Sequence, residues 1–401
     1  MEIIVLSSYF QSAHATANGL CARAVCQALR QQGHGVRVIC YASPGDAVKE
    51  EGIVEIPEKR DAFLQGSGMQ LRLRAYARTA REICSPWYDG TLVKHYVSAL
   101  SRLLQQKKAD MIIAMYFPLE TVLAAAAVKA AHPQIKTVVY ELDSAGDGIS
   151  NGKALDHLKE RAFERRMEGL YARFDGAVVM KSHEAYWRKT HGRHVKKMRV
   201  ADIPMITPAE HGEEERKAEK QPCFTCLYAG LLDAKHRNPG CFLQLLAGIN
   251  GEGQLLKAHF YSKGDCEETL KAIEKQHAYL ETHGYVAKDV LDAAGRAATC
   301  FLSLGNGSSN SVPSKLFFYI STGKPILHMA PRKEDVCVEY LKRYPMALVL
   351  YEGDPLQENI LRLRQFLLSR GGQAMDGAAI RQLYAENTPE FSAALIEAMG
   401  K

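Results

Sequence analysis

The sequence predicts an α/β protein made of two Rossmann-like domains that face a central cleft. Three observations support this prediction. Apolar runs typical of buried strands alternate with helical patterns along most of the chain. A polar stretch without large apolar side chains, residues 207–221, separates two portions of similar size. At 401 residues the chain is also longer than a single domain usually is.

The composition is typical of a globular protein from a reducing compartment. The apolar fraction of 47% is ordinary for a globular protein, and no run approaches the roughly 18 apolar residues of a membrane span. The chain starts directly with a strand-like run, Met1 to Leu6, and not with a signal peptide. Its ten cysteines are scattered, which favours a reducing cytoplasm. The net charge of +6 suits an anionic ligand or peripheral contact with the anionic inner face of a membrane, and we expect no nucleic-acid partner.

The first portion begins with a strand, a loop, a helix and a second strand. We expect the strands at 3–7 and 36–40, and a helix from residue 17 whose apolar positions repeat with helical spacing. Gly19 is the only glycine near the loop, so the Gly-x-Gly-x-x-Gly pattern of dinucleotide sites is missing. A dinucleotide oxidoreductase is therefore disfavoured. The loop contains His14, a candidate catalytic residue, although solvation or helix capping is the simpler role for a polar loop side chain.

An arginine-rich segment follows within residues 57–108, which have a mostly helical pattern. Its arginines are interleaved with a few apolar residues, and they are Arg60, Arg72, Arg74, Arg78 and Arg81. The pattern fits a surface for an anionic lipid or acceptor. The simpler interpretation is a solvated helix face.

Strands and helices then alternate again. The expected strands are 111–114, 136–142, 176–180 and 200–203, and the expected helices are 119–131 and 155–173. Asp143 directly follows one of these strands, at the edge where functional groups of parallel sheets collect. We take it as a second candidate catalytic residue, with capping of the next helix as the alternative role.

The second portion repeats the arrangement of the first. A strand at 223–229 leads into a loop that carries Lys235 and Arg237, and a basic loop between a strand and a helix suits a diphosphate. Cys223 and Cys226 are spaced like a metal-binding pair, but they lie on a strand and no second pair accompanies them, so we expect no metal site. The remaining strands are expected at 255–262, 281–286, 299–304, 325–329 and 347–350. The remaining helices are expected at 266–277, 288–296, 355–368 and, with a break near 386–389, 375–399.

Residues 306–325 are the most informative stretch. Small polar residues precede Pro313, and a helical pattern then runs from Lys315 to Thr322 and ends at Gly323. Unpaired N–H groups at a helix start favour a phosphate, and Lys315 would add a positive charge. Capped loops of this kind are common in α/β proteins, so an ordinary loop remains the alternative.

Four segments, in their order and spacing, resemble glycosyltransferases of the GT-B fold. The segments are Tyr228-Ala229-Gly230, Arg237-Asn238-Pro239, Gly284-Tyr285-Val286 and the run from Val312 to Pro325. The chain is most similar to the retaining glycosyltransferase family 4, which includes enzymes of bacterial cell-surface polysaccharide biosynthesis. The resemblance extends along most of the chain and is most specific in the second portion.

This resemblance implies a hexosyltransferase-like enzyme that moves a sugar from a nucleotide-diphosphate-sugar donor to a glycan or lipid-linked acceptor. It implies retention and no metal or cofactor, since the nucleotide-sugar is a substrate. The acceptor would bind a domain at 1–206, the linker would be 207–221, the donor would bind a domain at 222–388, and a final helix at 389–401 would pack back on the first domain. The implied donor-binding residues are Gly230, Lys235, Arg237, Tyr285, Val286, Asn306, Ser311, Ser314 and Lys315.

The chain departs from the family pattern at two positions. Where the family usually has two glutamates, this chain has Asn310 and Phe318, and Asn310 joins His14 and Asp143 as a catalytic candidate. Two alternatives therefore stay open: a protein that binds nucleotide-sugar without turnover, and a GT-B sugar-nucleotide epimerase. The helix around Phe318 is apolar nearly all round, which predicts that this ring faces the core. Packing against the ribose in the donor pocket is the alternative.

Overall fold

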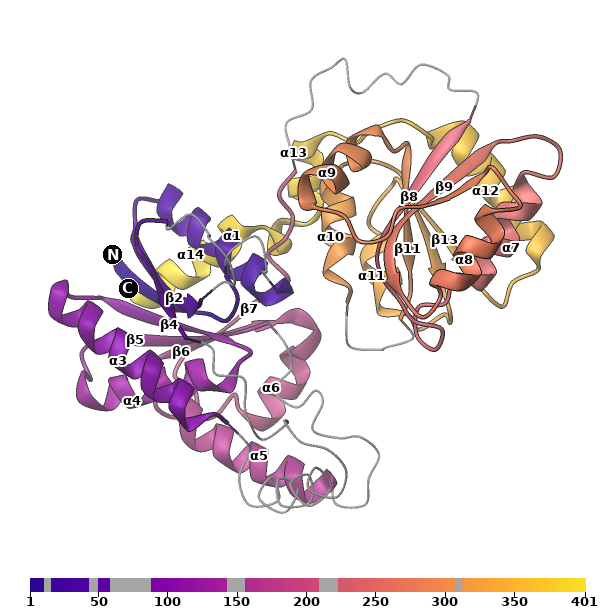
Figure 1. Ribbon diagram of the computed structural model, residues 1–401. Helices are drawn as coiled ribbons and strands as arrows, with labels where there is room; N and C mark the ends of the chain where they lie inside the picture. Colours follow the sequence, from indigo (N-terminus) through magenta and orange to yellow (C-terminus); the bar gives the residue numbers. More distant parts are fainter. Residues whose placement is uncertain (11–15, 43–49, 58–87, 143–155, 209–222, 307–311) are drawn as a thin grey trace. The chain divides into compact units, whose positions relative to one another are not determined.

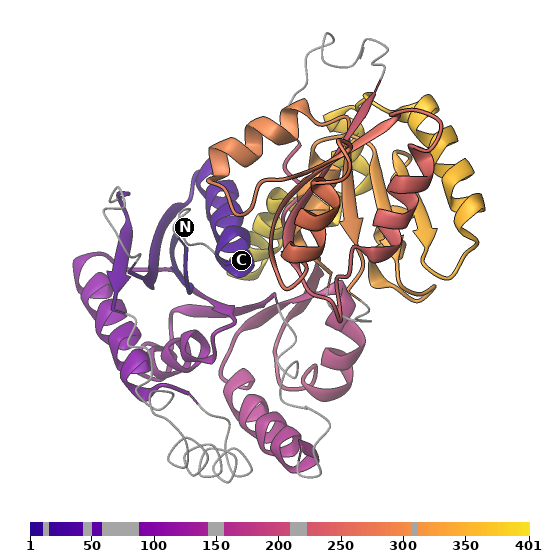
Figure 2. The ribbon, with the colours of Figure 1, turned by 45° about the vertical axis from the view of Figure 1, so that its right-hand side comes forward.

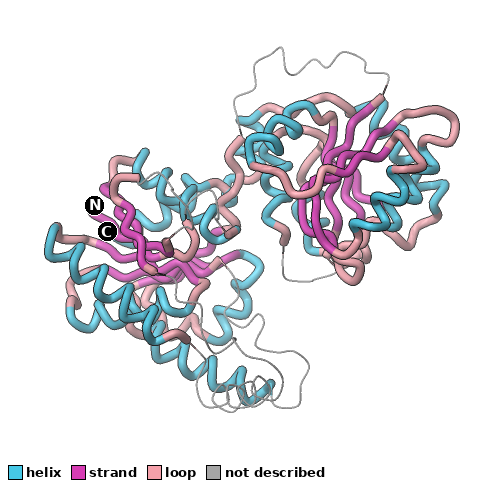
Figure 3. Tube along the Cα trace, in the orientation of Figure 1, coloured by secondary structure: helices cyan, strands magenta, loops and turns pink. Residues whose placement is uncertain are grey.

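The chain forms two compact units in the computed structural model, which describes residues 1–10, 16–42, 50–57, 88–142, 156–208, 223–306 and 312–401. One unit comprises Met1–Met205 and Glu386–Lys401, and the other comprises Ile206–Ala385. In each unit a parallel sheet lies between helices, as the tube in Figure 3 shows. None of the described helices combines the length and the apolar character that crossing a membrane requires.

The sheet of the first unit has the strand order β3-β2-β1-β4-β5-β6-β7, and neighbouring strands are parallel. Its strands are β1 (Glu2–Leu6), β2 (Gly35–Tyr41), β3 (Ile53–Ile56), β4 (Met111–Tyr116), β5 (Lys136–Glu141), β6 (Gly176–Met180) and β7 (Met198–Ala201). Because both faces are covered, the central strands are continuous apolar runs. The short edge strand β3 lacks such a run, and the sequence patterns do not predict it.

The helices of the first unit divide between the two faces of its sheet (Figures 1 and 2). They are α1 (Ala17–Gln31), α3 (Gly90–Gln106), α4 (Leu119–Ala131), α5 (Asp156–Tyr171), α6 (Glu184–Thr190) and α14 (Pro389–Gly400), with a short 3₁₀ helix at Lys181–His183. Successive side chains of a strand point to opposite faces of the sheet. Ile4 and Leu6 of β1 therefore belong to the core under α3 to α6, whereas Ile3 and Val5 belong to the core under α1 and α14.

The C-terminal helix α14 completes the core of the first unit. Its Ala393, Ile396 and Met399 are buried among apolar residues of α1 and the sheet. The hydroxyl groups of Ser392 and Tyr140 on β5 are 2.9 Å apart and share a hydrogen bond. A second helix, α1, runs beside α14 on this face. The first unit is therefore assembled from the two ends of the described chain.

The sheet of the second unit has the strand order β10-β9-β8-β11-β12-β13, again with parallel neighbours. Its strands are β8 (Phe224–Leu232), β9 (Leu256–Gly264), β10 (Leu280–Thr282), β11 (Cys300–Leu304), β12 (Ile326–Ala330) and β13 (Ala347–Tyr351). Its helices are α7 (Gly240–Ile249), α8 (Glu267–Glu274), α9 (Lys288–Ala297), α10 (Ser314–Ser321), α11 (Val336–Leu341), α12 (Leu356–Arg370) and α13 (Gly377–Leu383), and a 3₁₀ turn follows at Ala385–Asn387.

The strand order of the second unit places β8 and β11 side by side in the middle of the sheet. Helix α7 follows β8, and α10 follows β11. The chain continues from β8 toward one edge of the sheet and from β11 toward the other edge. Ligands of open α/β sheets bind outside the carboxyl ends of the two strands where the direction changes in this way. The fold therefore predicts a ligand site at the carboxyl ends of β8 and β11.

Candidate functional site

A pocket of about 150 Å³ lies at the carboxyl ends of β8 and β11 in the second unit. Its wall is formed by β8 and the loop after it, by the end of β11, and by the first turns of α10. The lining includes Gly230 and the polar residues Tyr228, Arg237, Ser303, Ser314 and Lys315. Of the donor-binding residues predicted from sequence, the structure therefore brings four together here: Gly230, Arg237, Ser314 and Lys315.

The basic loop after β8 is organised by one carboxylate. Asp233 Oδ1 accepts hydrogen bonds from the backbone N–H groups of Lys235 and His236, both at 2.8 Å. Backbone hydrogen bonds between Asp233 and Arg237 then close the loop. These N–H contacts lower the pKa of Asp233, so the carboxylate stays ionised at neutral pH. Arg237 is half-buried at the pocket, whereas Lys235 is exposed and does not line it.

Helix α10 is tied to the strand on the other side of the pocket. The hydroxyl of Tyr319 accepts a hydrogen bond of 3.0 Å from the backbone N–H of Ala229 on β8. Tyr319 is buried, and its ring stacks on Phe301 with ring centroids 4.5 Å apart. The N-terminal residue before α10 is Pro313, which supplies no side-chain cap. Ser314 and Lys315, the first two residues of the helix, line the pocket.

Two positive charges face this pocket. Loss of hydration lowers the pKa of Lys315, and the nearby charge of Arg237 lowers it further. Among the described residues, no carboxylate forms an ion pair with Arg237 or Lys315. Two cations beside a helix N-terminus, without an anionic partner in the described chain, make a site that suits a diphosphate.

Ser303 belongs to the pocket although sequence reasoning did not select it. It lies on β11, and its hydroxyl is 3.0 Å from Nδ1 of the buried His328 on β12. His328 Nε2 lies in turn 3.5 Å from Asp335 Oδ1, and both of these side chains are fully buried. One sequence signal could have found Ser303. It lies at the carboxyl end of a predicted strand, next to residues 306–325.

Other predicted donor-binding residues lie away from this pocket. Tyr285 is 81% exposed, and the ammonium of Lys263 lies 4.8 Å from its ring centroid. Val286 and Asn306 are half-buried and are not part of the pocket wall. Gly284, just before Tyr285, has a φ of 65°, a backbone conformation that favours glycine. Whether Tyr285 and Val286 meet a nucleobase stays a prediction.

Four candidate site residues fall outside the described residues: His14, Asp143, Asn310 and Ser311. The five arginines proposed as an anionic surface, from Arg60 to Arg81, also fall outside them. Near Asp143, the described Glu141 is fully buried and accepts a hydrogen bond of 2.7 Å from the Tyr171 hydroxyl. Glu141 is therefore part of the core of the first unit and is not exposed to solvent.

The predicted burial of Phe318 is wrong. Its ring is 37% exposed, and it contacts Phe301 edge-on with ring centroids 6.4 Å apart. The residues that α10 buries are Leu316, Phe317, Tyr319, Ile320 and Ser321. Phe318 does not line the pocket either. A helix that is apolar on nearly every side carries no periodic signal that separates its buried face from its open face.

Side chains able to share a metal ion lie elsewhere. Within the described part of the chain, groups of at least three such ligands close enough for one ion are His259 with Glu281 and His283, and His328 with Asp335 and Cys337. Cys223 and Cys226 belong to neither group, and Cys226 is buried on β8.

Comparisons with known proteins relate both the sequence and the fold to other chains. Residues 19–202 match the family model described as a glycosyl transferase 4-like domain. No curated protein sequence matches the chain. The solved structures below share its architecture.

Sucrose-phosphate synthase from Thermosynechococcus elongatus aligns with a TM-score of 0.57 at 12% identity, over 100% of this chain and 96% of that one. WaaG, a glycosyltransferase involved in lipopolysaccharide biosynthesis, aligns with a TM-score of 0.54 at 15% identity, over 99% of both chains. UDP-GlcNAc 2-epimerase from Methanocaldococcus jannaschii aligns with a TM-score of 0.57 at 9% identity, over 99% of this chain and 100% of that one. At these identities the likeness concerns the fold alone, and it confirms the predicted class of two Rossmann-like domains.

Proposed function

Because this chain carries a glycosyl transferase 4-like domain within a GT-B fold, we propose that it moves a sugar from a nucleotide-diphosphate-sugar to a glycan or lipid-linked acceptor. The family match confirms the predicted relationship to the glycosyltransferases and the prediction of an enzyme. The donor, the acceptor and the stereochemical course belong to the proposal.

One observation carries the assignment of the donor site. Arg237 and Lys315 both face the pocket at the ends of β8 and β11, beside the start of α10. A nucleotide diphosphate bound there would meet two cations and the start of helix α10 at once. Such contacts become stronger as the leaving diphosphate gains charge, which is how this site would promote departure of the nucleotide without a metal.

The first unit would hold the acceptor and the second the donor. His14, Asp143 and Asn310 remain the proposed catalytic residues, with a retaining outcome. The chemistry would proceed in the cytoplasm, because the nine cysteines that the structure describes are all free thiols. Peripheral contact with the inner face of a membrane would bring a lipid-linked acceptor within reach.

Calorimetric titration with UDP, GDP and ADP tests the donor site. Loss of a charge-assisted contact weakens binding by about 1.5–3 kcal/mol, so Lys315→Ala should weaken affinity for the preferred diphosphate by roughly tenfold or more. Lys342→Ala is a matched control, since Lys342 is an exposed lysine of the same unit that pairs with Glu339 at 2.7 Å. Equal affinity of the wild type and a folded Lys315→Ala protein would remove this assignment.

A second function is favoured by Phe318, which occupies a position where a family glutamate is expected and lies outside the pocket. This second function is binding of a nucleotide-sugar without turnover. Incubation with nucleotide-sugars and candidate acceptors distinguishes the functions. A glycosylated product supports transfer, tight binding without product supports the second function, and an epimerised donor supports the epimerase alternative.

A further inference from the structure

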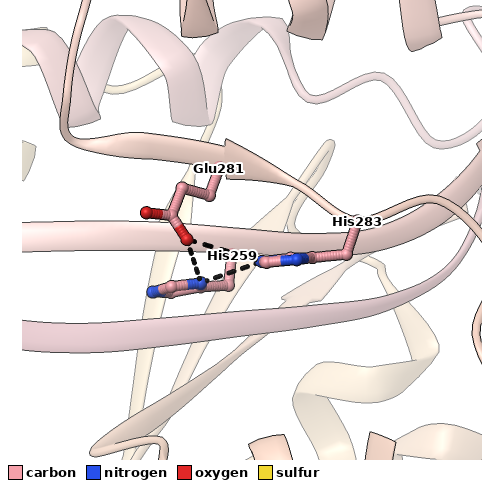
Figure 4. Close-up of side chains that lie close together, drawn as sticks. All are labelled: His259, Glu281 and His283. Atoms are coloured by element: carbon pink, nitrogen blue, oxygen red, sulfur yellow. Dashed lines mark hydrogen bonds and ion pairs between the residues drawn. The ribbon is translucent and has the colours of Figure 1, made fainter. Parts of the chain in front are cut away.

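Three side chains that could bind a metal ion come together near the edge of the second sheet (Figure 4). They share no residue with the pocket at the ends of β8 and β11. His259 on β9 and Glu281 on β10 are partners across two parallel strands. His283 follows Glu281 by two positions, and its backbone N–H still bonds to Phe260 O on β9 at 2.9 Å. Alternation along strands therefore places all three side chains on one face of the sheet.

The three ligand atoms already stand at separations that suit one ion. His259 Nδ1 is 3.1 Å from His283 Nε2 and 3.3 Å from Glu281 Oε2, and His283 Nε2 is 3.7 Å from Glu281 Oε2. Ligands about 2.0–2.2 Å from a tetrahedral Zn²⁺ stand roughly 3.3 Å from one another. We propose that His259, Glu281 and His283 form a binding site for a divalent transition metal, with Zn²⁺ as the ion that fits best and a fourth position left to solvent.

Neighbouring residues contact two of the three side chains and orient them. Lys257 forms an ion pair with Glu281 Oε1, which leaves Oε2 toward the histidines and lowers the pKa of the carboxyl group. The ring of Tyr261 stacks on His283 with centroids 4.3 Å apart, so the imidazole is held in plane.

The ligand set also selects the kind of metal. Two imidazoles and one carboxylate suit Zn²⁺, Cu²⁺, Ni²⁺ or Fe²⁺, whereas Mg²⁺ and Ca²⁺ prefer oxygen ligands. The alternative to a metal is a direct hydrogen bond between the two histidines beside a charged glutamate. Both arrangements use the same three side chains, so direct binding measurements must separate them.

A bound ion would hold the end of β10 to β9. Gly284 and Tyr285 follow His283 immediately, so the ion would anchor the start of the exposed loop that carries the Tyr285 ring. This anchoring is a property of the second unit alone and does not depend on the reaction that the protein performs.

Titration of the metal-free full-length chain with ZnCl₂ tests the proposal. The double variant His259→Ala/His283→Ala should bind one Zn²⁺ fewer than the wild type, and His283→Ala alone should weaken that ion by at least about 100-fold, since even outer-shell changes cost 10–100-fold. His277→Ala is the matched control, because His277 is an exposed histidine of the same unit that stacks on Tyr279 outside the cluster.

Co²⁺ loading of the wild type gives a readout that does not require the variants to fold. We expect visible absorption of a tetrahedral ion without the charge-transfer band of a thiolate ligand. Zinc binding that is equal in the wild type and the double variant would overturn the proposal. So would a wild type that binds no Zn²⁺.

Discussion

The hydroxyl of Ser303 and the imidazole of His328 are joined by a hydrogen bond of 3.0 Å between Oγ and Nδ1. Ser303 lines the pocket at the ends of β8 and β11, while His328 on β12 is completely buried. Asp335, which begins α11 by accepting a hydrogen bond from Cys337 N at 2.8 Å, lies beside the other nitrogen of His328. The pocket wall is thus supported by a polar chain inside the core.

Replacement of His328 should therefore cost more than replacement of Ser303. His328→Leu leaves the buried Asp335 carboxylate without its imidazole neighbour, and loss of one partner of a buried pair costs about 3–5 kcal/mol. Ser303→Ala removes one hydrogen bond and should cost about 1 kcal/mol. Urea unfolding of both variants measures the difference. Equal losses of stability would show that Asp335 does not rely on His328.

Asp175 predicts an acid-sensitive contribution to stability. Its carboxylate accepts hydrogen bonds from Lys129 Nζ at 2.7 Å, Thr137 N at 2.9 Å and Lys196 Nζ at 3.0 Å. Burial alone would raise the pKa of Asp175, but these donors outweigh burial and lower the pKa to about 2. The stabilisation, roughly 2 kcal/mol, is present above the unfolded pKa of about 3.9 and is lost as the pH falls toward about 2.

Unfolding measured from about pH 6 to pH 2 checks this prediction. Asp175→Asn should lower stability at neutral pH and flatten its acid dependence. Glu184→Gln, which removes a surface ion pair with Arg188 at 2.7 Å, should change stability by less than about 0.5 kcal/mol. An acid dependence that survives in Asp175→Asn would assign it to other carboxylates.

Gly19 should not tolerate a side chain. A Cβ at this position in the first turn of α1 would lie 1.6 Å from the backbone oxygen of Tyr9. Gly19→Ala must therefore displace the backbone, and we expect a loss of about 3 kcal/mol or more. Gly169 lies inside α5, and a Cβ there would meet nothing within 4 Å. Gly169→Ala should raise stability by about 0.5–1 kcal/mol, so thermal unfolding should move in opposite directions for the two variants.

Phe317 and Phe318 form a matched pair on α10. Phe317 is 0% exposed, whereas Phe318 is 37% exposed. Phe317→Glu would bury an unpaired carboxylate and should destabilise the second unit by several kcal/mol, while Phe318→Glu should change stability by about 1 kcal/mol or less. Melting temperatures of both variants provide the comparison. Strong destabilisation by Phe318→Glu would mean that its ring packs more tightly than its exposure indicates.

Sequence patterns located most strands, because a strand covered on both faces must be a continuous apolar run, as Met111 to Tyr116 is. They also brought Gly230, Arg237, Ser314 and Lys315 to one place, because the ends of neighbouring parallel strands share an edge. The side of α10 that carries Phe318 could not be predicted without knowing what packs against it. The pairing of His259 with Glu281 depends on the register of β9 and β10, which local sequence does not specify.

The position of α14 has a consequence for the order in which the protein takes shape during synthesis. Ala393, Ile396 and Met399 fill the core of the first unit, yet they leave the ribosome after all of Ile206–Ala385. The second unit can therefore close first, while the apolar face that awaits α14 remains open. The nascent chain would carry an unfinished N-terminal unit until the residues of α14 have been made.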